Sequence, residues 1–290
     1  RSISSGAILS SVLVPMTSFQ KNDLASKPLW NSSGSLVCLQ SQSFSNGKYA
    51  DTLSVIDPHS GRIVRSIAGA YTAEWMPQGT LLALREKDRG NLSIVEALSG
   101  KEEMVIPLNP AMKDSFISFR WHPKGGRLAV SVQNKLFVSD IASQDQLWSL
   151  AETLAKRPKS IKIYSWSPDG KKLFASGGGA EVIHGFDFND GYLAAPRQLV
   201  LRPANEQGIP GGLALSADGH AVYVAESWGQ RVEKISATDG RVLWVRSLAA
   251  AEGAATTEHE GMRLKAASNP DAPFPYTCLP DEKSGRVFRS

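Results

Sequence analysis

Three adjacent residues near the C-terminal end of the sequence, Glu258, His259 and Glu260, carry side chains that bind metal ions and transfer protons. Two carboxylates that flank an imidazole could hold a divalent cation or act as an acid and a base. Consecutive residues in a loop meet at one ion only where the backbone curls around it, so a solvated polar loop is the simpler interpretation. The cluster is the leading specific site, because it lies in residues 249–271, the longest departure from the repeat described below.

The other histidines and glycine-rich stretches form no known catalytic motif. His122 in "WHPKG" and His59 in "DPHSG" are expected in surface turns, and His220 follows a turn glycine. No pair of histidines has the helical i, i+4 spacing of a zinc motif, and no Gly-x-Ser-x-Gly elbow occurs. The stretch "SGGGA" at 176–180 lacks the Lys and Ser/Thr of a phosphate-binding loop. The sequence predicts no cofactor, but a divalent metal is possible, with Glu258, His259 and Glu260 as candidate ligands.

Composition narrows the class of protein. Lys and Arg exceed Asp and Glu by 32 − 28 = 4 residues, spread along the 290-residue chain, which argues against a nucleic-acid-binding face. Both cysteines, Cys38 and Cys278, lie in apolar runs and are expected to be free thiols rather than disulfide partners. No apolar run approaches the roughly 18 residues of a membrane-spanning helix.

A repeat organises the chain. A Trp or Leu is followed four residues later by a turn Gly, and these glycines are 45, 46, 45 and 49 residues apart. The pairs are Trp30–Gly34, Trp75–Gly79, Trp121–Gly125, Trp166–Gly170 and Leu215–Gly219, and a sixth copy ends at Gly285. A β-rich run follows each turn, which predicts a hairpin with the repeated Trp as a core residue.

A second strand–turn–strand series lies between these hairpins, as in "TLSVIDPHSGRIVRSI" and "RVEKISATDGRVLWVRSL". Four antiparallel strands per unit of about 45 residues are typical of a β-propeller blade. We therefore expect an all-β protein with one β-propeller domain over residues 1–290 and six blades. The expected blades are 27–67, 72–108, 116–150, 161–201, 210–248, and 273–290 completed by 1–14.

Closure of the ring is expected through the N-terminal segment. Residues Ala7 to Val14 follow Ser5-Gly6 as the outer strand follows Ser60-Gly61, so this segment is predicted to pair with residues 286–289. A third strand of the sixth blade is not evident. Either this blade has three strands, or the chain is cut from a longer parent.

Several segments resemble known propeller families. "SWSPDGKKLFAS" and "RWHPKGGRLAVS" resemble WD40-like and TolB-type repeats, and "GGLALSADGHAVYVAESWGQRVEKISATDGRVL" is similar to YVTN-type bacterial repeats. No unit ends in Trp-Asp and no Gly-His pair opens a blade, which departs from the WD40 pattern. The resemblance implies a repeat scaffold and favours a periplasmic or secreted location over the cytoplasm.

The segment "YVAESWGQRVEKI" also resembles six-bladed strictosidine-synthase-like and lactonase-like propellers. That resemblance implies a calcium or zinc site at the central channel, with Glu226, Glu74 and Asn134 as candidate ligands. These three residues do not occupy equivalent repeat positions.

Connection lengths point to one functional face. Turns of the Pro-Asp-Gly and Ser-Gly type are tight, whereas 42–50, 149–160, 201–210 and 249–271 are longer and fall at the opposite strand ends. Function commonly resides on irregular loops held by a rigid scaffold. Trp228 has no counterpart in other repeats and would reach this face, so Trp228, Glu226, Glu258, His259 and Glu260 are the candidate ligand-binding residues.

Two functions remain open from the sequence. The first is a non-catalytic binding or scaffold module, expected to be a monomer, whose variable loop face takes a protein, a peptide or a small ligand. The alternative is a propeller-type hydrolase, or the propeller part of a larger phosphoesterase-like enzyme, with a metal at the central channel. Neither interpretation involves a nucleic-acid partner or a membrane span.

Overall fold

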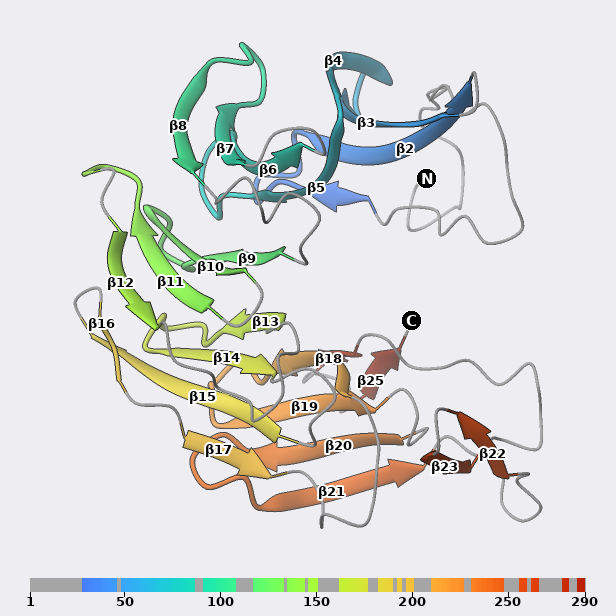
Figure 1. Cartoon of the computed structure of the whole chain (residues 1–290), viewed down its shortest axis with the longest axis vertical. Helices are drawn as coiled ribbons and strands as arrows, with labels where there is room; N and C mark the ends of the chain where they lie inside the picture. The colour runs from blue at the N-terminus through green and yellow to red at the C-terminus, as the bar shows by residue number, and fades with distance from the viewer. Residues whose placement is uncertain are drawn as a thin grey trace. The chain divides into compact units, whose positions relative to one another are not determined.

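The computed structural model shows an all-β chain (Figure 1). It describes residues 28–45, 48–86, 91–107, 117–132, 135–143, 146–150, 162–176, 182–189, 192–194, 197–200, 210–226, 231–247, 256–259, 262–265, 278–281 and 286–289. Every regular element in these ranges is a strand, and none of them contains a helix that could cross a membrane. The all-β fold class predicted from the sequence is confirmed.

Contacts divide the chain into two compact units, of which the first comprises residues 1–115 with 124–127 and 141–144. It contains two four-stranded antiparallel sheets, each in chain order. The first sheet consists of β1 (Leu29–Trp30), β2 (Val37–Ser45), β3 (Lys48–Asp57) and β4 (Arg62–Ala68). The second consists of β5 (Ala70–Trp75), β6 (Leu81–Glu86), β7 (Asn91–Glu96) and β8 (Glu102–Pro107).

The second unit contains residues 116–123, 128–140 and 145–290. Its first sheet has β9 (Ile117–Trp121), β10 (Arg127–Val132), β11 (Lys135–Asp140) and β12 (Gln146–Leu150). The next has β13 (Lys162–Trp166), β14 (Lys172–Ser176), β15 (Val182–Asn189), β16 (Tyr192–Leu193) and β17 (Arg197–Val200). The last four-stranded sheet has β18 (Pro210–Leu215), β19 (Ala221–Glu226), β20 (Arg231–Ser236) and β21 (Val242–Ser247).

The core lies between the faces of neighbouring sheets. In β14, Leu173 and Ala175 pack with the preceding sheet, whereas Phe174 between them packs with β19 and β20 of the following sheet. Alternate residues of a strand point to opposite faces, so a sheet covered on both faces requires continuous apolar strands such as "LFA". This requirement explains the short uninterrupted apolar runs that the repeat carries.

The repeated Trp links consecutive sheets through its indole N–H. Trp75 Nε1 donates to the carbonyl oxygen of Leu29 at 2.8 Å, and Trp166 Nε1 donates to that of Arg120 at 3.2 Å. In both cases the acceptor immediately precedes the Trp of the previous repeat. A buried indole requires an acceptor for its N–H, and the repeat supplies one at a fixed place.

Trp30 differs from the other repeated tryptophans. Trp75, Trp121 and Trp166 are buried as predicted, but Trp30 is 55 % exposed, so its assignment as a core residue was wrong. Trp75 and Trp166 each pack against the sheet that precedes them in the chain. Trp30 lies in the first sheet of the described chain, and the residues before it, 1–27, lie outside the described residues.

The fourth strand of the fourth sheet was also misplaced. In the fourth repeat the strand–turn–strand series has the sequence "EVIHGFDFNDGYLAA", which predicts the outer strand at "GYLAA", but only Tyr192–Leu193 pairs there, with Phe188 and Asn189. The longer outer strand is β17, which pairs with Val182–Gly185 of β15. Pro196, which has no N–H to donate to a ladder, separates the two segments in sequence.

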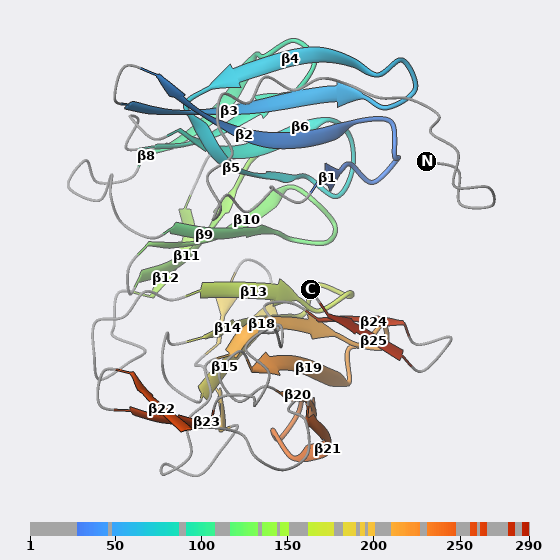
Figure 2. The same ribbon diagram turned by 90° about the vertical axis from the view of Figure 1, so that its right-hand side faces the viewer.

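Two further hairpins follow the fifth sheet. The predicted polar loop at 249–271 contains β22 (Thr256–His259) paired with β23 (Met262–Lys265), consistent with the β-branched Thr256 and Thr257. The expected start of the sixth repeat is present as β24 (Cys278–Asp281) paired with β25 (Arg286–Arg289). Strand β24 contacts β18 and β19, and it lies beside β18 in Figure 2.

Six blades, closure by the N-terminal strand and a single domain over 1–290 stay predictions. The closing segment Ala7 to Val14 lies outside the described residues. The described residues form five sheets with four or more strands each. The hairpin β24–β25 follows and corresponds to the start of a sixth repeat.

Candidate functional site

Each sheet has two chemically different ends. The connections β1–β2, β3–β4, β5–β6 and β7–β8 form the tight-turn end of the first unit, and they are short, as the sequence predicts. Antiparallel pairing puts the remaining connections, such as β2–β3 and β6–β7, at the opposite end, called here the variable end. The functional site is expected at the variable end, because the tight turns use their polar groups internally.

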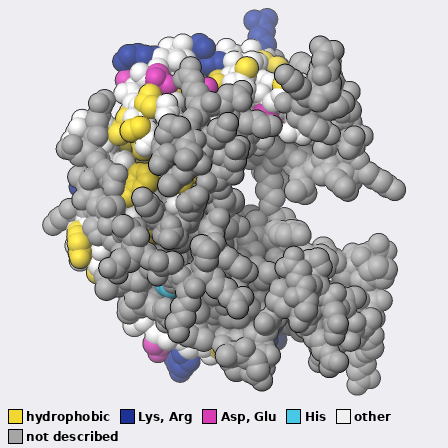
Figure 3. Space-filling model, in the orientation of Figure 1, with side chains coloured by type: hydrophobic (Ala, Val, Ile, Leu, Met, Phe, Trp, Pro, Cys, Tyr) yellow, Lys and Arg dark blue, Asp and Glu magenta, His cyan; other side chains and the backbone are white. Residues whose placement is uncertain are grey.

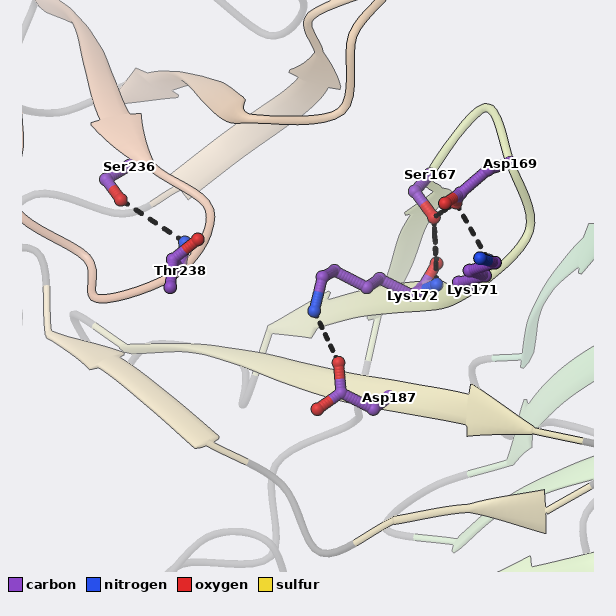
Figure 4. A network of polar contacts seen from close by, with 7 residues as sticks. All are labelled: Ser167, Asp169, Lys171, Lys172, Asp187, Ser236 and Thr238. Atoms are coloured by element: carbon purple, nitrogen blue, oxygen red, sulfur yellow. Dashed lines mark hydrogen bonds and ion pairs between the residues drawn. The ribbon is translucent and has the colours of Figure 1, made fainter.

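The turn after Trp166 illustrates how these polar groups are used (Figure 4). Ser167 Oγ donates to Asp169 Oδ1 at 2.6 Å and accepts from the backbone N of Lys172 at 2.8 Å, while Asp169 Oδ1 accepts from the backbone N of Lys171. These bonds, led by that from Ser167, lower the pKa of Asp169. On the adjacent strands, Lys172 Nζ contacts Asp187 Oδ1 at 2.5 Å.

The turn in the next repeat has the same chemistry. Ser216 Oγ donates to Asp218 Oδ1 at 2.5 Å and accepts from Ala221 N at 2.9 Å. The bond from Ser216 is the main cause of a lowered pKa at Asp218. The Ser and Asp of these turns are therefore structural, and their hydrogen-bonding capacity is already used.

His122 occupies the position of Ser167 and Ser216 in its own repeat, and its predicted surface location was wrong. Its ring is buried, with the centroid 5.0 Å from that of Trp166 and 5.6 Å from that of Phe188. Its Nε2 lies 3.1 Å from the carbonyl oxygen of Gly170. An imidazole reaches further than a serine hydroxyl, so it leaves its own turn and packs on the next sheet. His59 and His220 are exposed, as predicted.

The variable end of the first unit carries a long hairpin. Strand β1 pairs only with Val37 and Cys38 of β2, and β4 pairs only with 52–57 of β3. The two strands continue to pair with each other from Ser41–Thr52 to Ser45–Lys48, beyond both outer strands. Among the described residues, no further strand pairs with residues 41–51, called the projecting hairpin, of which 46–47 lie outside the described part. The sequence places Asn46-Gly47 between the strands, the dipeptide that two-residue hairpin turns favour.

The base of the projecting hairpin is anchored by polar contacts. Asp51 is buried and its Oδ1 accepts from Gln42 Nε2 at 3.0 Å, while its carbonyl oxygen accepts from Gly69 N at 2.7 Å. Gly69 joins β4 to β5, so the hairpin is fixed to the link between two sheets. Above this base, Gln42 and Ala50 are exposed. Gln42 and Ala50 are thus accessible on a strand pair whose base is fixed by hydrogen bonds.

The predicted metal cluster lies partly on the hairpin β22–β23. Glu258 pairs with Arg263 and His259 pairs with Met262, so the backbone at these two residues is extended rather than curled, and Glu260 lies outside the described residues. Among the described residues, no group of three or more His, Cys, Asp or Glu side chains is placed to hold a metal ion. The metal-binding role of this cluster stays a prediction.

The other candidate residues belong to different sheets. Glu226 ends β19, where it pairs with Arg231 and Pro210, and Trp228 falls in the β19–β20 connection outside the described residues. Glu74 lies in β5, opposite Ala83, whereas Asn134 is outside the described residues. Glu226 is on a second strand and Glu74 on a first strand, in agreement with their unequal repeat positions. Their roles as ligands stay predictions.

Two buried groups in the described residues have strongly perturbed environments. Cys38 is fully buried, as predicted, and burial raises the pKa of its thiol to about 12. His184, in the middle of β15, is 2 % exposed, and its Nδ1 has no hydrogen-bond partner. Burial lowers the pKa of His184, so the ring is neutral near pH 7. The sequence did not single out His184, because an apolar strand gives no sign of which neighbours surround it.

The outer surface of the first unit is mixed in charge. Over β4 and β8, Lys and Arg side chains and Asp and Glu side chains lie interspersed (Figure 3). Within this area Lys101 Nζ forms an exposed ion pair with Glu103 at 2.9 Å. Such a surface is solvated, and a pair of this kind contributes little to stability.

Within each unit, four-stranded antiparallel sheets pack face to face with the next sheet in the chain, and this arrangement defines the fold as a β-propeller. No protein-family model matches the sequence, and no curated protein matches it. Among solved structures, the chain is similar to the β-propeller domain of Cps50 (Swd1) from Myceliophteria thermophila. The TM-score is 0.59 at 14 % identity, over 77 % of this chain and 73 % of that chain.

A second similar structure is a chain of the mitotic checkpoint complex. Its TM-score is 0.61 at 13 % identity, over 94 % of this chain and 73 % of that chain. At these identities the likeness concerns the fold. The predicted resemblance to WD40-like propellers is therefore confirmed at the level of architecture.

Proposed function

We propose that this chain is a non-catalytic protein-interaction scaffold that binds a protein or peptide at its variable end. The observation that carries the proposal is the projecting hairpin, residues 41–51, which extends beyond both outer strands of its sheet. The other described sheets keep the second and third strands at six residues or fewer, apart from β15. None of its described side chains is a buried apolar group, and a role in binding accounts for the extension.

The chemistry of the hairpin suits a peptide ligand. Gln42 is exposed and Ser43 is half-buried, and they carry an amide and a hydroxyl group, whereas Ser41 is buried. The pairing pattern leaves both outer edges of this strand pair without a further paired strand among the described residues. Fixed polar groups on a rigid support recognise a peptide at low entropic cost. The similar chain in the mitotic checkpoint complex also comes from an assembly, and this supports a scaffold role by analogy of fold.

The test begins with a selection of peptides. A random peptide library displayed on phage is selected against the intact protein, and enriched peptides are measured by fluorescence anisotropy. In a shortened variant, residues 43–50 are replaced by Asn-Gly, so that Gln42 and Asp51 flank a two-residue turn. We expect the enriched peptides to lose binding to this variant while the circular dichroism spectrum and thermal midpoint are retained.

The control variant changes the tight-turn end of the same sheet instead of the variable end. His59→Ala changes an exposed side chain in the tight turn between β3 and β4, and it should leave peptide affinity unchanged. The proposal is wrong if no peptide is enriched, or if enriched peptides bind the shortened variant as well as they bind the parent.

A further inference from the structure

The outermost strand of the fifth sheet, β21, presents an exposed apolar run. Val242, Leu243 and Val245 are 43 %, 43 % and 42 % exposed. Arg241, just before the strand, and Arg246 within it are also exposed. The only described strand that pairs with β21 is β20, so its other edge has no ladder partner in the part of the chain that the structure describes. An exposed apolar edge of this kind is a template for a further strand.

Other outermost strands with described side chains are protected. Strand β8 carries Glu102 and Glu103 and ends at Pro107, a combination that disfavours pairing with another chain. In β4, the Arg65 guanidinium is bound to the carbonyl oxygen of Leu98 in the next sheet, at 2.8 and 3.2 Å. Strand β21 has neither an acidic residue nor a proline.

Strand β21 contains a bulge, which affects how its residues can pair with a further strand. Ladder pairs run from Arg231–Ser247 to Lys234–Trp244 and then shift to Ile235–Val242, so Leu243 is the extra residue. A bulge interrupts regular pairing at one point. Pairing with β20 is therefore regular from Trp244 to Ser247 and resumes at Val242, and Leu243 between them is an exposed apolar group.

Positive charge accompanies this edge. The Arg246 guanidinium lies 6.0 Å from the Trp244 ring centroid, and Lys234 Nζ on the adjacent strand lies 5.2 Å from that of Tyr223. The Tyr223 and Trp244 rings are themselves 6.0 Å apart. Aromatic rings hold the cations on this face, and Arg241 adds a third positive charge at the other end of the strand.

The charges also discriminate between possible occupants. If β21 of a second copy paired antiparallel about the centre of Val242–Val245, Arg241 would face Arg246 at both ends. Like charges directly opposite one another destabilise a strand pair. A segment with acidic ends and an apolar centre would instead place a carboxylate opposite each arginine.

We propose that the outer edge of β21 binds an extended peptide segment, with acidic residues at its ends and apolar residues between them, as an added antiparallel strand. Backbone hydrogen bonds supply affinity, and the two arginines supply specificity and register. This surface is separate from the projecting hairpin, so the inference does not depend on the proposed function and extends it to a second binding surface.

The probe is a short synthetic peptide with Glu at both ends and alternating Val and Thr between them, compared with a peptide in which Lys replaces both Glu. Binding to the intact protein is measured by fluorescence anisotropy. We expect the Glu peptide to bind more tightly. The double variant Arg241→Glu/Arg246→Glu should reverse the preference, and its affinity for the Glu peptide should fall by about tenfold or more.

The matched control is Arg62→Glu. Strand β4 has the same bulge as β21, with Val64 as its extra residue. Arg62 lies two positions before Val64 and is exposed, just as Arg241 lies two positions before Leu243 and is exposed. This variant should leave both affinities unchanged. Hydrogen exchange adds a readout of strand addition, because amides of residues 243–247 should exchange more slowly when the Glu peptide is bound.

Three results would overturn the proposal. The first is equal affinity of the intact protein for both peptides, and the second is retention of the Glu preference by the charge-reversed variant. The third is a concentration-dependent dimer of the intact protein that Val245→Glu abolishes, since this would assign the edge to a second copy. Shortening the projecting hairpin should not alter any of these measurements.

Discussion

Substitution of Gly170 by alanine is expected to lower the free energy of unfolding for two reasons: the left-handed backbone at this residue and a clash with His122. Gly170 has φ +75°, and an added Cβ would clash directly with Cε1 and Nε2 of His122. A left-handed conformation costs a non-glycine residue about 1–2 kcal/mol. Displacing His122 would also remove its hydrogen bond, worth about 1 kcal/mol, and ring contacts worth about 0.5–1.5 kcal/mol.

The total expected loss for Gly170→Ala is therefore about 2.5–4.5 kcal/mol in the free energy of unfolding. Gly219→Ala is the matched control, because Gly219 ends the equivalent turn at φ +71° and its added Cβ would meet only ordinary contacts at 3.8 and 3.9 Å. This control should lose about 1–2 kcal/mol. Urea unfolding followed by tryptophan fluorescence measures both values.

A double-mutant cycle decides whether His122 is the cause. In a His122→Ala background the obstructing ring is absent, so Gly170→Ala should cost no more than Gly219→Ala. If Gly170→Ala has the same effect in both backgrounds, the contact between the third and fourth sheets through His122 does not carry the energy assigned to it.

Three further predictions concern buried groups. Because Cys38 is fully buried with a raised pKa, it should resist a thiol reagent in a Cys278→Ser background until urea unfolds the protein, and rapid labelling of the native state would contradict this burial. The folded-state pKa of His184 lies below the ordinary value of 6.5, so the unfolded chain binds more protons below that value. The thermal midpoint should therefore fall as pH decreases from 6.5, and His184→Leu should reduce this slope; an unchanged slope would refute the assignment. Trp75→Phe removes the N–H that donates to the carbonyl oxygen of Leu29, and it should lower the free energy of unfolding by about 1 kcal/mol beyond the effect of lost packing. An unchanged free energy of unfolding in urea would show that this hydrogen bond contributes nothing.

Local features of the fold could be predicted from the sequence. The glycines after Trp75, Trp166 and Leu215 preset tight turns, and the strands beside them carry apolar residues, so the hairpins follow from neighbouring residues alone. The same reasoning failed at the outer strand of the fourth sheet, where Tyr192–Leu193 and Arg197–Val200 divide the pairing with β15. Pairing partners at an outer edge depend on packing as well as on local pattern.

The candidate site was predictable only in outline. Loop lengths indicated that function would lie at one end of the strands, and 42–50 was among the long connections. The sequence could not show that β2 and β3 keep pairing beyond their neighbours, or that Asp51 is buried against Gln42. These facts depend on where β1 and β4 stop pairing with the hairpin strands, at Leu29 and at Ala68.

By itself the sequence determined the repeat, the four-stranded unit and the tight turns, because spacing and turn chemistry act over a few residues. The tertiary structure decided which equivalent residues have equivalent surroundings. Trp75 is buried and Trp30 is exposed, and His122 fills a contact between sheets where Ser167 closes its own turn. Whether a residue is buried or exposed depends on the neighbouring sheet. A periodic sequence repeats the residue type, but it does not show which residues will lie next to each copy.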